Sequence, residues 1–167
     1  RGVAFDASGN MYIADTNNHR IRRVTPAGVI STYVGTGVAG SAGDGGPATS
    51  AQINGPLSVA VDESGNLYIA DTGNHKIRKV SPGGTISTFA GASFGSSGDG
   101  GAASAAAIAS PVSLAYDAAT QTLYFAQGIT TYPYIRKITL ANGVIAPVAG
   151  TGNNTDSGDG GPASVHR

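Results

Sequence analysis

The chain has 167 residues, of which 26 are glycine and 12% are charged, and its formal net charge is zero. The shortage of long helix-forming side chains argues against an all-α fold, and no apolar stretch reaches the roughly 18 residues of a transmembrane helix. A neutral chain has no overall attraction to nucleic acids or anionic membranes. The absence of cysteine excludes disulfides and thiolate metal sites.

The first 35 residues contain four short segments with strand character, at residues 2–6, 11–15, 21–24 and 30–35. Their apolar residues alternate with polar ones and include many Val, Ile, Tyr and Phe residues, which is typical of β-strands. Residues 6–10 and 25–28 separate them and carry Gly, Asn and Pro where tight turns use them. We therefore predict a four-stranded antiparallel meander, with strands a, b, c and d in chain order.

The same unit recurs twice, and Asp6, Asp62 and Asp117 stand at equivalent positions 56 and 55 residues apart. A glycine-rich linker follows each unit and repeats Gly-Asp-Gly-Gly at residues 43–46, 98–101 and 158–161. In the first linker Pro47 precedes an Ala-rich stretch, which favours a brief helical turn. Residues 102–109 have the same character.

Tandem four-stranded units of this length predict an all-β fold, a β-propeller segment of three four-stranded antiparallel blades. The expected divisions are residues 1–52 and 53–108 for the first two blades with their linkers, 109–160 for the third, and 161–167 for the start of a further linker. Because propellers have roughly four to eight blades, three cannot close a ring. We expect further blades, from the same parent chain or from another copy.

Residues 59–80, Val-Ala-Val-Asp-Glu-Ser-Gly-Asn-Leu-Tyr-Ile-Ala-Asp-Thr-Gly-Asn-His-Lys-Ile-Arg-Lys-Val, resemble an NHL repeat. The triplet that names this family of six-bladed propellers corresponds to residues 18–20 and 74–76. The third unit departs from the pattern, because it has Gln127 in place of Asp71 and no Asn-His pair. The resemblance implies a scaffold that binds proteins, glycans or RNA. A minority of the family are lyases, one of them zinc-dependent, but that zinc-ligand pattern is not matched here.

Antiparallel strands place the b–c turns and the linkers at one rim of the ring, and rigidly held loops are where binding usually resides. The candidate binding residues on this rim are Gln127, Tyr132, Pro133 and Tyr134, since aromatic residues are favoured at interfaces. The alternative is that the two tyrosines pack on the neighbouring linker.

Six further residues are expected to hold the b–c turns together. They are Asp15, Asn18, His19, Asp71, Asn74 and His75. A zinc site would need three or more ligands that converge, and the two histidines stand in separate units. We therefore expect each histidine to bind within its own turn, with the aspartate and asparagine as partners.

The linker aspartates Asp44, Asp99 and Asp159 suggest calcium, but Ca²⁺ takes six to eight oxygen ligands and each linker offers one or two. The favoured interpretation is that they accept backbone N–H bonds in turns or cap the following helical turn. No arrangement in the sequence supports catalysis. We therefore predict no metal, no cofactor and no catalytic residue.

The basic residues gather on the c strands, including Arg22, Arg78 and Arg136. They are expected to form salt bridges and a solvated edge, and a phosphate-binding stripe is the alternative. Asn153 begins a glycosylation sequon.

The leading hypothesis is a non-catalytic extracellular or cell-surface scaffold that binds a protein or glycan. The alternatives are a lyase with an axial site completed by other blades, and an RNA-binding propeller. Neither nucleic-acid binding nor membrane insertion is favoured.

Overall fold

The described residues of the computed structural model, 1–128 and 134–150, form three four-stranded antiparallel sheets in chain order. The first contains β1 Val3–Phe5, β2 Met11–Asp15, β3 Arg20–Val24 and β4 Ile30–Val34. The second contains β5 Ser58–Val61, β6 Leu67–Asp71, β7 Lys76–Val80 and β8 Ile86–Ala90. The third contains β9 Pro111–Asp117, β10 Thr122–Gln127, β11 Tyr134–Thr139 and β12 Val144–Ala149. The prediction of three four-stranded antiparallel sheets is confirmed.

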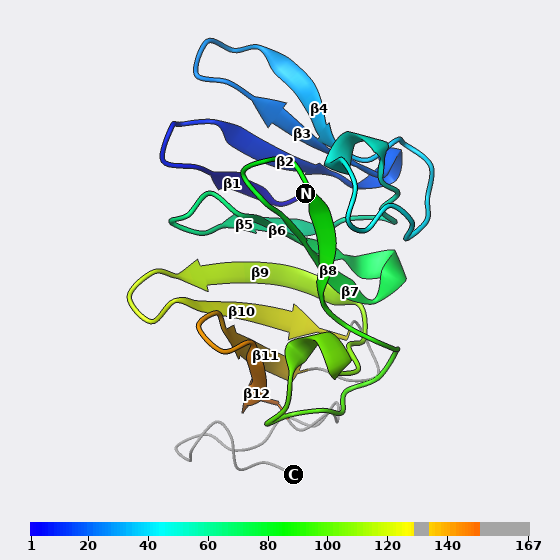
Figure 1. Ribbon diagram of the computed structural model, residues 1–167, viewed down its shortest axis with the longest axis vertical. Coiled ribbons are helices and arrows are strands. Elements are labelled where there is room, and N and C mark those ends of the chain that lie inside the picture. Colours follow the sequence, from blue (N-terminus) through cyan, green and yellow to red (C-terminus); the bar gives the residue numbers. More distant parts are fainter. Residues whose placement is uncertain (129–133, 151–167) are drawn as a thin grey trace.

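The sheets follow one another along the long axis of the molecule, with the second sheet between the other two (Figure 1). The inner strands β1, β5 and β9 contact one another in that order. One apolar core lies between the first and second sheets and includes Ile21, Ile69 and Ile86. The other lies between the second and third sheets and includes Tyr68 and Phe125. The middle sheet is therefore covered on both faces, whereas each outer sheet has a neighbour on one face.

A carboxylate organises the hairpin at the start of each of the first two sheets. Asp6 accepts the backbone N–H of Asn10 at 2.9 Å, and its second oxygen accepts the Tyr12 hydroxyl at 3.0 Å. Asp62 forms the same two bonds with Asn66 and Tyr68. A buried tyrosine hydroxyl is thereby satisfied, and the first two strands are held in register.

Four short 3₁₀ helices connect the strands in the described part of the chain. Two of them, η2 Ala48–Ser50 and η4 Ala103–Ala105, are the brief helical turns expected in the linkers. The other two, η1 Thr16–Asn18 and η3 Thr72–Asn74, form the b–c turns and were not expected. None of the described helices is long and apolar enough to cross a membrane.

The linkers do not stay at the rim, which corrects the sequence-based placement of their Gly-Asp-Gly-Gly segments. Gly45 donates its backbone N–H to Ile86 at 2.8 Å, and Ile86 donates to Gly46 at 3.0 Å. Ala48 donates its backbone N–H to the carbonyl of Gly84, in the turn that precedes β8. The first linker therefore runs along β8 of the following sheet before it returns to β5. The physical reason is that unpaired N–H and C=O groups at a strand edge are stabilised by hydrogen bonding to another segment.

Glycine at position 91 is required by both conformation and space. Its φ is +101°, and a Cβ atom there would lie 2.5 Å from the carbonyl oxygen of His75. Gly84 has a similar φ of +82°, but a Cβ atom would meet nothing within 4 Å. We predict that Gly91→Ala lowers the free energy of unfolding by at least about 3 kcal/mol, and Gly84→Ala by about 1 kcal/mol. Urea unfolding measures both, and equal losses would contradict the assigned close approach.

Candidate functional site

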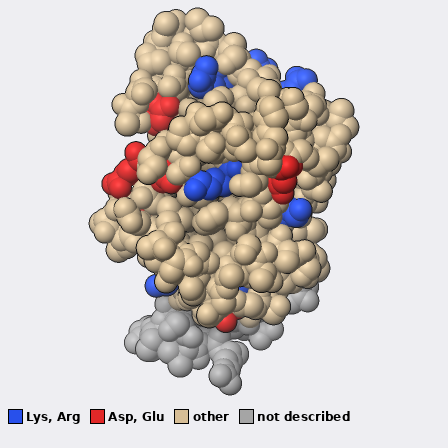
Figure 2. All heavy atoms as spheres, viewed as in Figure 1, with Lys and Arg blue, Asp and Glu red and all other residues tan. Residues whose placement is uncertain are grey.

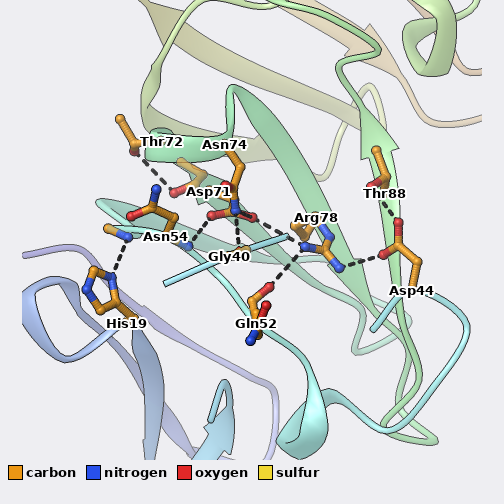
Figure 3. A network of polar contacts seen from close by, with 12 residues as sticks. His19, Gly40, Asp44, Gln52, Asn54, Asp71, Thr72, Asn74, Arg78 and Thr88 are labelled. Carbon is orange, nitrogen blue, oxygen red and sulfur yellow. Dashed lines mark hydrogen bonds and ion pairs between the residues drawn. The ribbon is translucent and has the colours of Figure 1, made fainter. Parts of the chain in front are cut away.

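A fully buried arginine lies between the first linker and the second sheet. Arg78, on β7, is 0% exposed. Its Nη2 lies 2.6 Å from Oδ1 of Asp44, which comes from the linker, and its Nη1 lies 3.3 Å from Oδ2 of Asp71 at the end of β6. Nη1 also donates to the carbonyl of Gln52 at 3.3 Å. Figure 3 shows this guanidinium surrounded by residues of the linker and of β6–β8.

The third sheet repeats this arrangement with one substitution. Arg136, on β11, is 1% exposed and donates through Nη2 to Asp99 at 2.7 Å. Its Nη1 donates to the carbonyl of Ala107 at 2.8 Å and to the side-chain oxygen of Gln127 at 3.3 Å. Gln127 therefore stands where Asp71 stands in the second sheet. It is 1% exposed, so its position is that of a buried partner of the arginine rather than of a surface residue.

The two carboxylates around Arg78 differ in how readily they ionise. Burial raises the pKa of Asp71, although it accepts hydrogen bonds from Asn74 and Asn54 and lies beside Arg78. Burial also works against ionisation of Asp44, but the Thr88 hydroxyl and the Arg78 charge outweigh it and hold the pKa of Asp44 below its usual value. Asp44 is also the nearer of the two carboxylates to the Arg78 guanidinium, at 2.6 Å against 3.3 Å for Asp71. In the third sheet Asp99 occupies the place of Asp44 and supplies the carboxylate, while the residue in the place of Asp71 is the neutral Gln127.

An irregularity in strand pairing accompanies each of these arginines. The register shifts between Ile77 and Arg78, and again between Ile135 and Arg136. The first sheet has the same shift between Ile21 and Arg22. A bulge locally bends and twists a strand and re-aims its side chains. It recurs beside the arginine in every sheet, and in the second and third sheets it lies where the guanidinium meets the linker.

These contacts correct two sequence-based interpretations. Arg78 and Arg136 do not line a solvated edge or a phosphate-binding stripe, because they are buried in ion pairs. Asp44 and Asp99 do not cap the turns of their own linkers but bind arginines of the following sheet. The third linker aspartate, Asp159, lies outside the described residues. The sequence did contain a signal for this pairing. Every unit has an arginine two residues before an apolar residue of its c strand, and every linker has an aspartate between two glycines.

The b–c turns contain the predicted pairs of aspartate and asparagine. Asn18 donates to Asp15 at 2.9 Å, and Asn74 donates to Asp71 at 2.8 Å. The histidines behave differently from the prediction. His19 and His75 end the turns with positive φ of 51° and 57°, and their rings reach the segments that lead into the next sheets.

The histidine rings accept hydrogen bonds from these segments. Nδ1 of His19 accepts the backbone N–H of Gly55 at 3.1 Å, and Nδ1 of His75 accepts that of Ser110 at 3.2 Å. The prediction that each histidine binds the aspartate and asparagine of its own turn is therefore wrong. Each histidine ends its turn in the left-handed conformation, and its ring contacts the segment that leads into the next sheet. Each histidine joins one sheet to the entry of the next.

An exposed aromatic residue lies beside one of these histidines. Phe94, in the second linker, is 59% exposed, and its ring contacts the His75 ring edge-to-face at 4.9 Å between centroids. Ser110, bound by His75, lies next to Gly128, whose N–H donates to the carbonyls of Ala109 and Ser110. These contacts place Phe94 and His75 near the start of the loop that leads to Tyr134, a half-buried residue opposite Gln127.

Three predicted residues fall outside the described part of the chain, namely Tyr132, Pro133 and Asn153. In residues 1–128 and 134–150, no group of three or more His, Asp or Glu side chains is positioned to hold a metal ion.

Comparisons with known proteins agree with this architecture. A family profile described as an NHL repeat matches residues 1–24, and one described as the teneurin NHL domain matches residues 36–97. The chain carries NHL repeats. The first match covers β1–β3 of the first sheet, and the second match covers the first linker, which supplies Asp44, and the second sheet.

Similar proteins include two of known sequence and one of known structure. Mouse teneurin-1 is 36% identical over 94 residues, which cover 48% of this chain and 3% of that protein. The chloroplastic Protein SUPPRESSOR OF QUENCHING 1 of Arabidopsis thaliana is 36% identical over 80 residues, or 47% of this chain and 7% of that protein. The NHL chain thus spans a small part of these relatives.

A Bacteroides thetaiotaomicron protein of unknown function matches in structure, with a TM-score of 0.73 and 21% identity. The match covers 98% of this chain and 38% of that chain. It shows that the three sheets have the arrangement found in a larger protein of the same fold.

The ion pairs that Asp44 and Asp99 form with the buried arginines yield a prediction about stability. Asp99→Asn leaves Arg136 with no carboxylate, since Gln127 is neutral, and should lower the free energy of unfolding by about 3 kcal/mol. Asp44→Asn should cost less, because Asp71 remains beside Arg78. Adding Gln127→Glu to Asp99→Asn should recover part of the loss. Urea unfolding of the variants tests this, and an equal or larger loss for Asp44→Asn would contradict it.

The depressed pKa of Asp44 also predicts a pH dependence. A carboxyl that ionises more readily in the folded state stabilises the fold above its ordinary pKa of 3.8, and that stabilisation is lost as the pH falls through the folded value. The difference in stability between the wild type and Asp44→Asn should therefore shrink below about pH 4. Thermal unfolding between pH 7 and pH 3 measures it, and a constant difference would contradict the assigned shift.

Proposed function

We propose that this NHL module is a non-catalytic recognition scaffold that binds a protein or glycan partner through one patch of its rim. The rim patch is defined as His75, Phe94 and the loop from Gly128 to Tyr134. The observation that carries the proposal is the exposed Phe94 ring, which is supported by His75. An aromatic ring held in place loses little conformational freedom on binding and offers a large apolar surface.

The support for Phe94 extends into the sheets. The His75 ring that contacts it accepts the N–H of Ser110, and the Thr72 hydroxyl in the same turn donates to the carbonyl of Pro111 at 2.6 Å. Phe94 and His75 are therefore held by the junction between the second and third sheets. Two tyrosines and a proline stand in the adjoining loop sequence at residues 132–134, a composition favoured at protein interfaces and suited to stacking on sugar rings.

Weak overall charge favours this mode of recognition over electrostatic capture. The face drawn in Figure 2 shows few charged side chains, with basic and acidic atoms interspersed. An extracellular or cell-surface location, with a glycan on Asn153, belongs to this proposal. It rests on the similarity to the teneurin NHL domain, while the similar Arabidopsis protein is chloroplastic by name.

The test is a screen of the chain against a glycan array and a panel of extracellular protein domains. Each ligand found is then remeasured by surface plasmon resonance with Phe94→Ala and with Tyr132→Ala/Tyr134→Ala. We expect each variant to weaken binding at least ten-fold without loss of folding, because anchor residues dominate interface energies.

Val38→Ala serves as the matched control. Val38 occupies the position of Phe94 in the first linker and is also exposed, and its truncation should leave the affinity unchanged. The absence of any ligand, or ligands bound equally by all the variants, would refute the rim patch.

A further inference from the structure

The first sheet has the same linker-binding residues as the second sheet. On the second sheet, Arg78 and the Thr88 hydroxyl bind Asp44 of the linker, and Asn74 donates to the Gly40 carbonyl. Asp71 accepts the N–H of Asn54 at 2.7 Å. The corresponding residues of the first sheet are identical in type, and they are Asp15, Asn18, Arg22 and Thr32.

In the first sheet, none of the described linker residues forms a hydrogen bond or an ion pair with these side chains. Arg22 forms no ion pair with any described residue, and its one hydrogen bond is to the Ser31 carbonyl at 3.3 Å. Ile30 is 54% exposed, whereas its counterpart Ile86, which lies against Gly45 and Gly46, is 0% exposed. Asp15, Asn18, Arg22 and Ile30 line a groove of about 440 Å³. This groove and Thr32 are called the acceptor face.

The matching segment occurs in the same chain. Residues 158–163 read Gly-Asp-Gly-Gly-Pro-Ala, identical to residues 43–48, and the Gly-Thr-Gly at 150–152 repeats that at 35–37 with the same spacing to the aspartate. The position of Asp44 is thus taken by Asp159. A carboxylate in this segment is the charge that Arg22 lacks.

Both outer sheets, the first and the third, also expose apolar side chains on the face that has no neighbouring sheet among the described residues. The third sheet presents Tyr124, Ala126 and Ile135 beside a pocket of about 180 Å³. In the second sheet the corresponding Tyr68, Ala70 and Ile77 are buried against the third sheet. Ile135 is 38% exposed, and Val3 and Phe5 of the first sheet are more than half exposed.

The first sheet, which carries the acceptor face, and the third sheet lie at opposite ends of the row of sheets, with the second sheet between them (Figure 1). We propose that the acceptor face of one chain binds residues 158–163 of a second copy, with Asp159 paired to Arg22, so that the chain associates head to tail. Such a contact joins unlike surfaces, and it gives a closed ring or an open series of chains according to the rotation between copies.

Charge reversal tests the pairing. Sedimentation velocity of the 167-residue chain should show a dimer or a larger species at micromolar concentration. Arg22→Asp and Asp159→Arg should each raise the dissociation constant at least ten-fold, and the double variant should restore it to within about three-fold, because opposite charges are paired again. Asp156→Arg, in the same linker but out of register, is the control and should have no effect.

Disulfide trapping gives a second readout that tolerates small losses of stability. The chain has no cysteine, so mixing Thr32→Cys with Asp159→Cys should give a disulfide between the two different chains, as the Thr88–Asp44 contact requires. Asp156→Cys replaces Asp159→Cys in the control and should give none. A monomeric wild type, single reversals without effect, or no trapped pair would overturn the proposal. That result would indicate that a linker of another repeat in a longer chain fills the acceptor face.

Discussion

The ion pair between a buried arginine and an aspartate of the preceding linker is the interaction on which the rest of the structure depends. Arg78 and Arg136 have almost no exposed surface, and a buried guanidinium without an anion would be strongly destabilising. The linker that supplies the anion must therefore follow the strand edge of the next sheet. Its backbone bonds to Ile86 and Ile145 then cover that edge. At each of the two described junctions, one charge pair thus fixes the path of a long, glycine-rich connection.

The same pair explains how the sheets are kept in order. A linker that leaves one sheet binds the next, while His19 and His75 bind the segments that enter the following sheets. Polar contacts hold each junction beside an apolar core, and Figure 3 shows the polar contacts of the first junction. At the second junction, the exposed Phe94 ring contacts His75, which takes part in these bonds. In the third sheet, Gln127 in place of Asp71 keeps the geometry with one carboxylate fewer, because Asp99 supplies the charge.

Much of the fold could be predicted because its signals are local. Alternation of apolar residues gives the strands, Gly and Pro mark the turns, and the repeat gives the number of sheets. The path of the linkers could not be predicted in this way, because it depends on pairs such as Asp44 and Arg78 that are distant in sequence. Residues 77–80, Ile-Arg-Lys-Val, contain two basic residues, and the sequence pattern alone placed both in solvent. Two features distinguish the buried Arg78, namely the strand bulge beside it and its position two residues before Val80, on the same face of the strand. The partners of His75 were missed because they depend on a left-handed residue and on the next sheet.

Amide hydrogen exchange of the linkers tests the central account most directly. The N–H groups of Gly45 and Gly100 donate to Ile86 and Ile145, and both glycines adjoin an aspartate that binds a buried arginine. If the ion pairs hold the linkers on the sheets, these amides should exchange about as slowly as those in the middle of β7 and β11. Exchange at the rate of an unprotected loop, while the strands stay protected, would contradict the account.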